Sequence, residues 1–386
     1  MSELPDKYRA LLNLIRELYG AEGHIPLHEP RFMGNEKRYL NDCIDSTYVS
    51  SVGEYVNRFE DMMRELTGSR CAIATANGTV ALHMSLILAG VRDGDEVITQ
   101  PLSFVATCNA IAYQRAHPVF VDVDRDTMSL SPTALRVFLE EHAERRDDGC
   151  YNRGTGRRIV AAVPMHTFGL PGRIEALADI CDEWGIVLIE DAAESIGSTV
   201  GNRHTGTFGR MGAFSFNGNK TVTCGGGGCI TTNDEALGKL GKHLTTTAKV
   251  PHAWEFYHDQ VGYNYRLPNL NAALACAQLE QLPGMLANKR ETALRYKRFC
   301  AERGIPFFDE LKGRTANFWL NAILTDSLEE RDALLTVSNA AGVMMRPVWK
   351  LMQRLPAFAD AQSGPLDNAE WLEDRVVNIP SSVRLS

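Results

Sequence analysis

A lysine that precedes a run of glycines is the residue in this sequence best suited to covalent chemistry. Lys220 follows the apolar run 213–216, and four consecutive glycines occupy positions 225–228. Glycines let the backbone turn sharply and approach a bound group, because they carry no Cβ. A lysine held there away from water could form a Schiff base with a carbonyl compound. A solvated surface lysine is the alternative; a P-loop is disfavoured, since no GxxxxGK[ST] pattern precedes a helix here.

A carboxylate at the end of another apolar run could complement that lysine. Asp191 closes the run 186–189 and precedes Ala192 and Ala193, whose small side chains leave room for a group to lie against the backbone. A carboxylate in this place could pair with the ring nitrogen of a pyridine and keep it protonated, which makes the ring an electron sink. The alternative role for Asp191 is an N-cap of a following helix.

Two further segments follow apolar runs and could bind the rest of such a ligand. Asn77, Gly78 and Thr79 lie between a strand that ends near Thr75 and a helix, where free N–H groups and the helix dipole suit a phosphate. Asn77 could instead be a simple helix cap. Phe104, in segment 101–107, could stack on an aromatic ring or belong to the core.

The elements that must position these residues alternate between strands and helices. Short apolar runs predict strands at 71–74, 96–99, 119–123, 159–164, 186–189, 213–216 and 228–231. Helical patterns lie at 37–45, 55–67, 80–88, 132–144 and 173–184, with a charged surface loop expected over 145–157. This alternation predicts an α/β fold with a mainly parallel sheet of about seven strands, covered by helices on both faces. Ligands bind such sheets where strands end.

The chain divides into three expected parts. Residues 1–30 form an N-terminal extension with an amphipathic helix at 4–19, and residues 31–282 form the large domain. A long helical pattern begins after about residue 282 and leads into 306–308 and 317–324 of a small α+β domain over 283–386, with a terminal strand near 377–379.

Composition excludes several classes of function. The formal net charge of −8 gives no support for nucleic-acid binding. Nine cysteines without a CxxC pair argue against a zinc knuckle or a disulfide framework, and no metal ligands are expected. No stretch is long and apolar enough to cross a bilayer, so a cytoplasmic protein with no membrane partner is expected.

Taken in order, these segments resemble fold type I PLP enzymes and, more narrowly, the DegT/StrS-type sugar aminotransferases. The resemblance runs from about residue 30 to residue 382. The occurrence of all its motifs in this order is more specific than any single motif. The motifs that carry it are residues 77–82, 191–194, 215–220 and 262–268.

The resemblance implies a role for each matching residue. Lys220 would be the Schiff-base lysine and the catalytic residue, and Asp191 the partner of the pyridine nitrogen. Phe104 would stack on the ring. The phosphate positions match Gly78, Thr79 and Ser215, while Asn264 would reach the phosphate of a partner subunit in a homodimer. His166 matches a histidine beside the pocket, with Asn77 nearby.

Glu194 departs from the glutamine or histidine common at its position in the family. A neutral side chain there can donate a hydrogen bond toward the phenolic oxygen of the cofactor. An ionised carboxylate would repel that oxygen unless Glu194 is protonated or turned toward the substrate. Glu194 is therefore expected at the cofactor, as a residue that could affect specificity.

The combination of motifs looks most like the branch that acts in legionaminic-acid and bacillosamine-type pathways of surface-glycan synthesis. This implies transfer of an amino group from L-glutamate, which leaves 2-oxoglutarate, to the C4 ketone of a UDP-linked 2-acetamido-4-keto-6-deoxy sugar. A GDP-linked keto-sugar of perosamine type or a cyclitol ketone remain alternatives. A sugar dehydratase of this family would have histidine in place of Lys220, and a non-catalytic regulator would not need Lys220 and Asp191 together.

Overall fold

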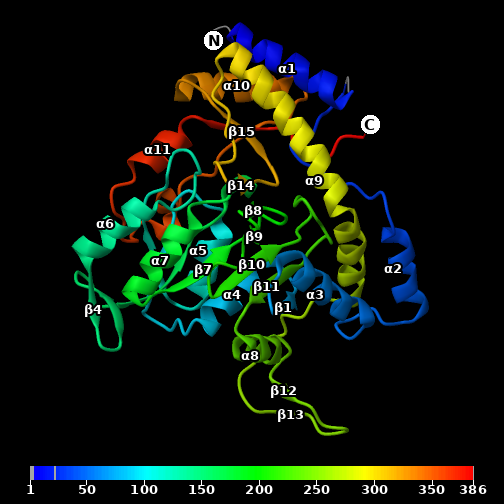
Figure 1. Ribbon diagram of the computed structural model, residues 1–386, viewed down its shortest axis with the longest axis vertical. Coiled ribbons are helices and arrows are strands. Elements are labelled where there is room, and N and C mark those ends of the chain that lie inside the picture. The colour runs from blue at the N-terminus through cyan, green and yellow to red at the C-terminus, as the bar shows by residue number, and fades with distance from the viewer. Residues whose placement is uncertain (1–3, 21–22, 386) are drawn as a thin grey trace.

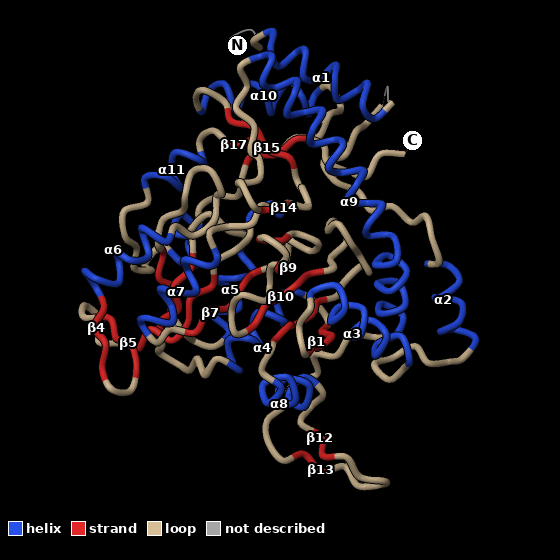
Figure 2. The backbone as a smooth tube through the Cα atoms, in the orientation of Figure 1, coloured by secondary structure: helices blue, strands red, loops and turns tan. Residues whose placement is uncertain are grey.

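The computed structural model describes residues 4–20 and 23–385 (Figure 1). The parts of the expected segments 1–30 and 283–386 that fall on residues 1–3, 21–22 and 386 lie outside the described residues. Within the described residues, a central sheet carries helices on both faces, and a smaller C-terminal sheet lies at one end (Figures 1 and 2).

Seven strands form the path of the main sheet, in the order β1-β11-β10-β7-β6-β2-β3. Their bounds are β1 Cys71–Thr75, β2 Glu96–Thr99, β3 His117–Phe120, β6 Arg158–Val163, β7 Val187–Asp191, β10 Met211–Ser215 and β11 Gly228–Thr232. The pairs β10–β7, β7–β6, β6–β2 and β2–β3 are parallel, whereas β11 is antiparallel to both of its neighbours. The predicted α/β fold with a mainly parallel sheet is therefore confirmed. Because β11 reverses direction between β1 and β10, these two strands run the same way and end at the same edge.

Helices cover both faces of the sheet. On one face, apolar side chains of α4 (Gly78–Leu88), α5 (Val105–Tyr113) and α8 (Glu235–Thr245) share a core with β1, β2, β6 and β10. On the other face, α6 (Pro132–His142) and α7 (Ile174–Trp184) pack over the parallel strands. The helices α3 (Glu54–Thr67) and α9 (Asn269–Arg303) cover the β10–β11 end, next to α2 (Glu36–Asp45).

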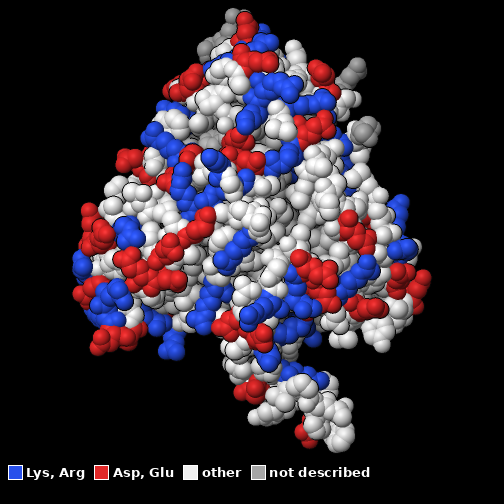
Figure 3. All heavy atoms as spheres, viewed as in Figure 1, with Lys and Arg blue, Asp and Glu red and all other residues white. Residues whose placement is uncertain are grey.

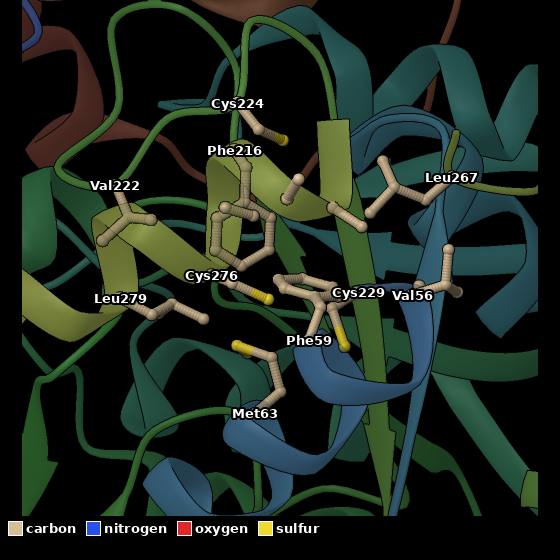
Figure 4. Packing of buried hydrophobic residues seen from close by; sticks show 14 of the residues in the cluster. Val56, Phe59, Met63, Phe216, Val222, Cys224, Cys229, Leu267, Cys276 and Leu279 are labelled. Atoms are coloured by element: carbon tan, nitrogen blue, oxygen red, sulfur yellow. The ribbon is translucent and has the colours of Figure 1, made fainter. Parts of the chain in front are cut away.

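The core under α3 and α9 is packed around two phenylalanines (Figure 4). The rings of Phe59 and Phe216 meet edge to face with their centroids 5.1 Å apart, and both side chains are fully buried. Phe216 directly follows Ser215 at the end of β10, so this packing fixes the strand from which the segment up to Lys220 departs.

The structure differs from the sequence predictions at three places. Residues 145–157 are not only a loop: β4 (Ala143–Arg146) and β5 (Gly149–Asn152) form a hairpin that joins β6. Helix α5 over residues 105–113 was not predicted, because its hydrophobic residues lie all round the helix and give no amphipathic period. The long helix begins at Asn269 and continues through Pro283, so the expected boundary at residue 283 lies inside α9.

The C-terminal part forms a small α+β unit around an antiparallel sheet. Its strands are β15 (Asn321–Leu324), β17 (Val376–Ile379) and β16 (Arg346–Pro347). The helices α10 (Leu328–Ala340), α11 (Asp367–Glu373) and the N-terminal α1 (Asp6–Tyr19) lie around it, with the end of α9 (Figure 1). Short 3-10 turns lie at Thr167–Gly169, Met352–Arg354 and Pro356–Phe358, and β14 (Arg314–Thr315) pairs with β8 (Thr199–Val200), next to β9 (Arg203–His204).

A hairpin projects from the body of the molecule beyond α8. It contains β12 (Lys249–Val250) and β13 (Tyr257–His258), and it lies at the bottom of Figure 1. Few charged side chains cover its tip in the space-filling view (Figure 3). Within residues 4–20 and 23–385, no helix is long and apolar enough to span a membrane.

Candidate active site

The segments that follow β1, β2, β7 and β10 open onto one cavity of about 550 Å³. All four strands end at the same edge of the sheet, which is where an open α/β sheet binds ligands. The cavity is lined by Asn77, Gly78, Thr79, Val80, Leu82, Phe104, Ala106, Tyr113, Met165, Asp191, Ala193, Glu194, Ser215, Asn217, Asn219, Lys220, Trp319 and Trp349. The structure thus brings together all the sequence-predicted site residues except His166 and Asn264.

Lys220 presents its amine to this cavity between a carboxylate and an aromatic ring. Its Nζ lies 3.1 Å from Glu194 Oε1 and 3.9 Å from the centroid of the Trp319 ring. The side chain is only 12% exposed, so the amine meets water through the cavity alone. The turn that carries it is closed by the Lys220 N–H, which donates to the Asn217 carbonyl. An amine in this position can act as a nucleophile and carry protons.

Asp191 is a buried carboxylate whose two oxygens each accept one hydrogen bond. The Thr107 hydroxyl donates to Oδ2 at 2.6 Å, and the Ala193 N–H donates to Oδ1 at 3.1 Å. Burial raises the pKa of Asp191, and these two donors act against that rise together with the charge of Lys220. The Asp191 carboxylate therefore gains from a cationic N–H placed in the cavity beside it.

Glu194 is the second buried carboxylate of the cavity. Its Oε2 accepts the Phe168 N–H at 2.9 Å, while Oε1 faces Lys220. Phe168 adopts a left-handed backbone conformation with φ of 57°, which a non-glycine residue rarely takes and which aims its N–H at the carboxylate. Burial raises the pKa of Glu194, and the charge of Lys220 opposes this rise.

The end of the cavity at the start of α4 is shaped to accept an anion. Gly78 and Thr79 belong to the first turn of α4, whose N–H groups have no acceptor within the helix. Asn77 also caps the helix, since its side chain accepts the Val80 N–H at 3.0 Å. A Cβ on Gly78 would lie 2.7 Å from the Ser215 Cβ, so only glycine lets α4 approach β10 this closely.

Aromatic side chains line the mouth and the wall of the cavity. Phe104 is half exposed at the start of α5, and its ring lies 6.4 Å from that of Trp349. Trp349 also packs on Phe168, with centroids 5.1 Å apart, and Phe168 contacts Trp319 in turn. Phe104 was expected here; the two tryptophans were not.

His166 lies behind the cavity rather than on its lining. The Gly172 N–H donates to its Nδ1 at 3.2 Å, so the ring proton is on Nε2, which donates to Glu190 at 2.9 Å. Glu190 also accepts the N–H groups of Gly206, Phe208 and Gly209. His166 thus joins the segment after β6 to β7, the strand that carries Asp191.

Asn264 lies outside the cavity of its own chain. It is exposed, and the Arg266 Nε donates to its Oδ1 at 3.3 Å. It follows the projecting hairpin, and residue 264 pairs with residue 246 at the end of α8. In this structure, Asn264 therefore does not reach the cavity of its own chain.

Sequence reasoning gave no role to several residues of this site, among them Thr107, Trp319 and Trp349. Thr107 lies within the quoted segment 101–107, but its contact with Asp191 depends on α5, which was not predicted. Trp319 and Trp349 come from the C-terminal part, and no local pattern connects them to strand ends more than a hundred residues earlier. Among the described residues, no group of three or more His, Cys, Asp or Glu side chains is arranged to hold a metal ion.

Comparison with known proteins places this geometry among aminotransferases. The model of the DegT/DnrJ/EryC1/StrS aminotransferase family matches residues 31–386. EpsN of Bacillus subtilis (strain 168), named as a pyridoxal phosphate-dependent aminotransferase, is 37% identical over 339 residues, which are 87% of this chain and 84% of EpsN. GDP-perosamine synthase of Escherichia coli O157:H7 is 35% identical over 94% of both chains. The crystal structure of the aminotransferase TlmJ from Streptoalloteichus hindustanus is similar with a TM-score of 0.85 and 27% identity, covering 94% of this chain and 95% of TlmJ.

Proposed function

This chain belongs to the DegT/DnrJ/EryC1/StrS family of PLP-dependent sugar aminotransferases, and we propose that it aminates the C4 ketone of a UDP-linked 2-acetamido-4-keto-6-deoxy sugar, with L-glutamate as donor. The proposal extends to the branch of the family that serves surface-glycan synthesis. The observation that carries the aminotransferase chemistry is the meeting of the Lys220 amine and the Asp191 carboxylate in one cavity with the first turn of α4.

The residues of the cavity fit pyridoxal phosphate. Asp191 is buried with a raised pKa, so a pyridinium N–H would supply the positive partner that its carboxylate needs. The first turn of α4 with Ser215 offers donors for a phosphate, and the half-exposed face of Phe104 is free to stack on a ring. When bound, PLP supplies an aldehyde that exchanges amino groups and a ring that withdraws electrons from the reacting carbon.

Lys220 performs two tasks in this scheme. Its Nζ would hold the cofactor, and as a free amine Nζ would take a proton from Cα of the amino donor and deliver it to the cofactor. Glu194 Oε1 lies 3.1 Å from Nζ and is the nearest group able to accept or return that proton. Burial raises the pKa of Glu194, which favours its protonated form and so limits repulsion of a phenolic oxygen close by. Asp191 would hold the ring nitrogen of the cofactor.

A homodimer is part of the proposal, with Asn264 of one chain reaching the phosphate site of the other. The hairpin beside Asn264 leaves large apolar side chains in water: Trp254 is 78% exposed, Phe256 81% and Val261 82%. Exposed apolar surface of this kind indicates an association site. A second copy of the chain would cover it and bring Asn264 to a cavity.

A GDP-linked keto-sugar is the second candidate substrate. The 35% identity to GDP-perosamine synthase over 94% of both chains favours it. The two candidates differ in the base and in the group at C2 of the sugar, so direct competition between them shows which one the enzyme prefers.

The test is incubation of the purified chain with PLP, L-glutamate and a panel of UDP- and GDP-linked keto-sugars, followed by mass spectrometry. We expect a product in which an amino group replaces the ketone oxygen, together with 2-oxoglutarate, and with UDP substrates consumed faster. Lys220→Ala should show no turnover above trace. Amination by Lys220→Ala at a rate near that of the wild type would refute the role of Lys220, and loss of oxygen without amination would indicate a dehydratase.

A further inference from the structure

A tryptophan of the C-terminal part forms one side of the position occupied by the Lys220 amine. Trp319 precedes β15, is 4% exposed, and its ring centroid lies 3.9 Å from Lys220 Nζ. Glu194 contacts the same Nζ at 3.1 Å. The amine is therefore held between a carboxylate from the segment after β7 and the π face of an indole.

The Trp319 ring has its own fixed position. Its indole N–H donates to the Asn219 carbonyl at 2.7 Å, directly before Lys220 in the chain. Its backbone N–H donates to Asn317 Oδ1 at 2.8 Å, and its carbonyl accepts the buried amine of Lys289 at 3.2 Å. The ring and both backbone polar groups of Trp319 are thus hydrogen-bonded, and the ring cannot turn away from Lys220 without breaking the bond from its indole N–H to Asn219.

The residue that holds Trp319 also holds the backbone of Glu194. The Asn317 side-chain amide donates to the Glu194 carbonyl at 2.8 Å and to the Ile196 carbonyl at 2.9 Å. A Cβ on Gly169 would overlap Asn317 Oδ1, so the structure leaves space for this amide only because residue 169 is glycine. One asparagine therefore sets the distance between the two groups that contact the Lys220 amine.

We propose that Trp319 is a positioning residue for Lys220: its π face holds the protonated amine at the cavity, in register with Glu194, whenever the amine is free. An aromatic face attracts a cation most strongly where water is excluded, and this site is buried. The other charged or titratable groups that act electrostatically with Lys220 are Asp191 and His28; the ring of His28 lies 6.4 Å from that of Trp319. The ring of Trp319 and the carboxyl group of Glu194 thus contact the same amine, at 3.9 Å and 3.1 Å from its Nζ.

This inference rests on the proposed role of Lys220, but its test requires neither cofactor nor substrate. The full-length chain, freed of PLP with hydroxylamine, is treated with an amine-reactive reagent over a range of pH, and modification of Lys220 is followed by peptide mass spectrometry. Trp319→Leu should shift the half-reaction point of Lys220 to lower pH by about one unit, since the cation loses its aromatic partner. Trp319→Phe should restore most of the wild-type behaviour.

Two controls separate positioning from packing. Trp349→Leu removes an indole from the same cavity without contact to Lys220 Nζ, and it should leave the half-reaction point in place. Where Trp319→Leu does not fold, site-specific fluorinated tryptophans at position 319 keep the shape of the ring and weaken only its attraction for a cation. Their increasing fluorination should shift the point progressively.

An unchanged half-reaction point with fluorinated residues at 319, or an equal shift in Trp349→Leu, would overturn the proposal. Failure of the substrate assay with a shift still present at 319 would instead contradict the proposed function alone. The two conclusions are therefore distinguishable.

Discussion

At Lys220, one amine faces two buried carboxylates. Burial raises the pKa of both Asp191 and Glu194, and the charge of Lys220 is among the effects that lower each of them. The cavity residues are therefore poised to accept further positive charge, and a pyridinium beside Asp191 would supply it. Glu194 would then be free to exchange its proton with the amine. With a cation beside each of them, the carboxyl groups of Asp191 and Glu194 can occupy one cavity without repelling each other.

Removal of the lysine should therefore cost stability in a way that depends on pH. In Lys220→Ala the pKa of Glu194, already raised by burial, should rise further because its cation is gone. A carboxyl with a folded pKa above its unfolded value adds stability at pH below about 4.5, and this is lost as pH rises. We expect cofactor-free Lys220→Ala to be about 3 kcal/mol less stable than the wild type at pH 8, and less affected at pH 5.

Urea unfolding at pH 5 and pH 8 measures this difference. Glu194→Gln in the Lys220→Ala background should restore much of the stability at pH 8, since it removes the buried carboxylate. The exposed Lys239→Ala is the matched control and should unfold like the wild type. Equal losses at both pH values, with no rescue by glutamine, would show that Glu194 is not the cause.

At the scale of elements, the site depends on how closely α4 approaches the sheet. The start of α4 must lie against β10 for Gly78, Thr79 and Ser215 to surround one anion. Both elements were predicted, and their contact follows from the parallel ends of β1 and β10. The distance between them, however, is a property of packing, and it leaves no room for a side chain at residue 78.

Gly78→Ala should therefore weaken cofactor binding. The added Cβ would meet the Ser215 Cβ at 2.7 Å, so α4 or Ser215 must move, and overpacking of this kind costs about 1–3 kcal/mol. We expect PLP affinity to fall by about tenfold or more, measured by fluorescence titration. Gly284→Ala, where a Cβ would meet nothing within 4 Å, should bind PLP as the wild type does. Unchanged affinity in Gly78→Ala would place the phosphate elsewhere.

Helix α9 links the two parts of the molecule and carries a buried lysine between them. Lys289 is 1% exposed, and its amine donates to the carbonyls of Trp319 and Ser381, with no carboxylate among these partners. Burial lowers the pKa of Lys289 to about 7. Lys289 therefore links the segment of Trp319 to the C-terminal end of the chain. Burying its amine away from water lowers the free energy of unfolding when the amine is protonated.

This cost should appear as a pH dependence of stability. Between pH 7 and about 10.5 the unfolded chain binds the Lys289 proton while the folded chain releases it, so stability rises with pH. The unfolding free energy of the wild type minus that of Lys289→Met should increase by up to about 1.4 kcal/mol per pH unit above pH 7. Thermal or urea unfolding of both proteins from pH 6.5 to 9.5 provides the measurement. A difference that stays constant over this range would contradict the lowered pKa of Lys289.

At the scale of the whole molecule, the projecting hairpin exposes large apolar side chains that a single chain does not bury. It extends beyond α8, and its tip carries few charged side chains (Figures 1 and 3). Trp254 and Phe256 have no partner that would bury them in this chain, being 78% and 81% exposed. The proposed dimer would cover them, and it would also make use of Asn264.

Polar residues at the tip should therefore weaken the dimer and the site together. Trp254→Ser with Phe256→Ser should raise the dimer dissociation constant by about tenfold or more, because exposed aromatic residues dominate association energy. Analytical ultracentrifugation at several concentrations measures this, and specific activity should fall as monomer forms. Val137→Ser with Leu294→Ser, at exposed apolar sites on α6 and α9, is the control. A wild-type chain that is monomeric and fully active would refute the dimer.

The sequence by itself determined the alternation of strands and helices, most of the predicted residues that line the cavity, and their place at strand ends. These follow from local patterns: apolar runs, a lysine before glycines, and an aspartate that closes a strand. Lys220, Asp191, Gly78, Thr79 and Phe104 could be named because the ends of parallel strands must meet at one edge.

Only the tertiary structure decided what surrounds the amine. Trp319 and Trp349 reach the cavity from the C-terminal part, Thr107 reaches Asp191 from a helix without an amphipathic pattern, and His166 bonds to Glu190 of β7 behind the cavity. Contacts between side chains far apart in sequence depend on how elements pack, and packing distances leave no periodic trace in a sequence.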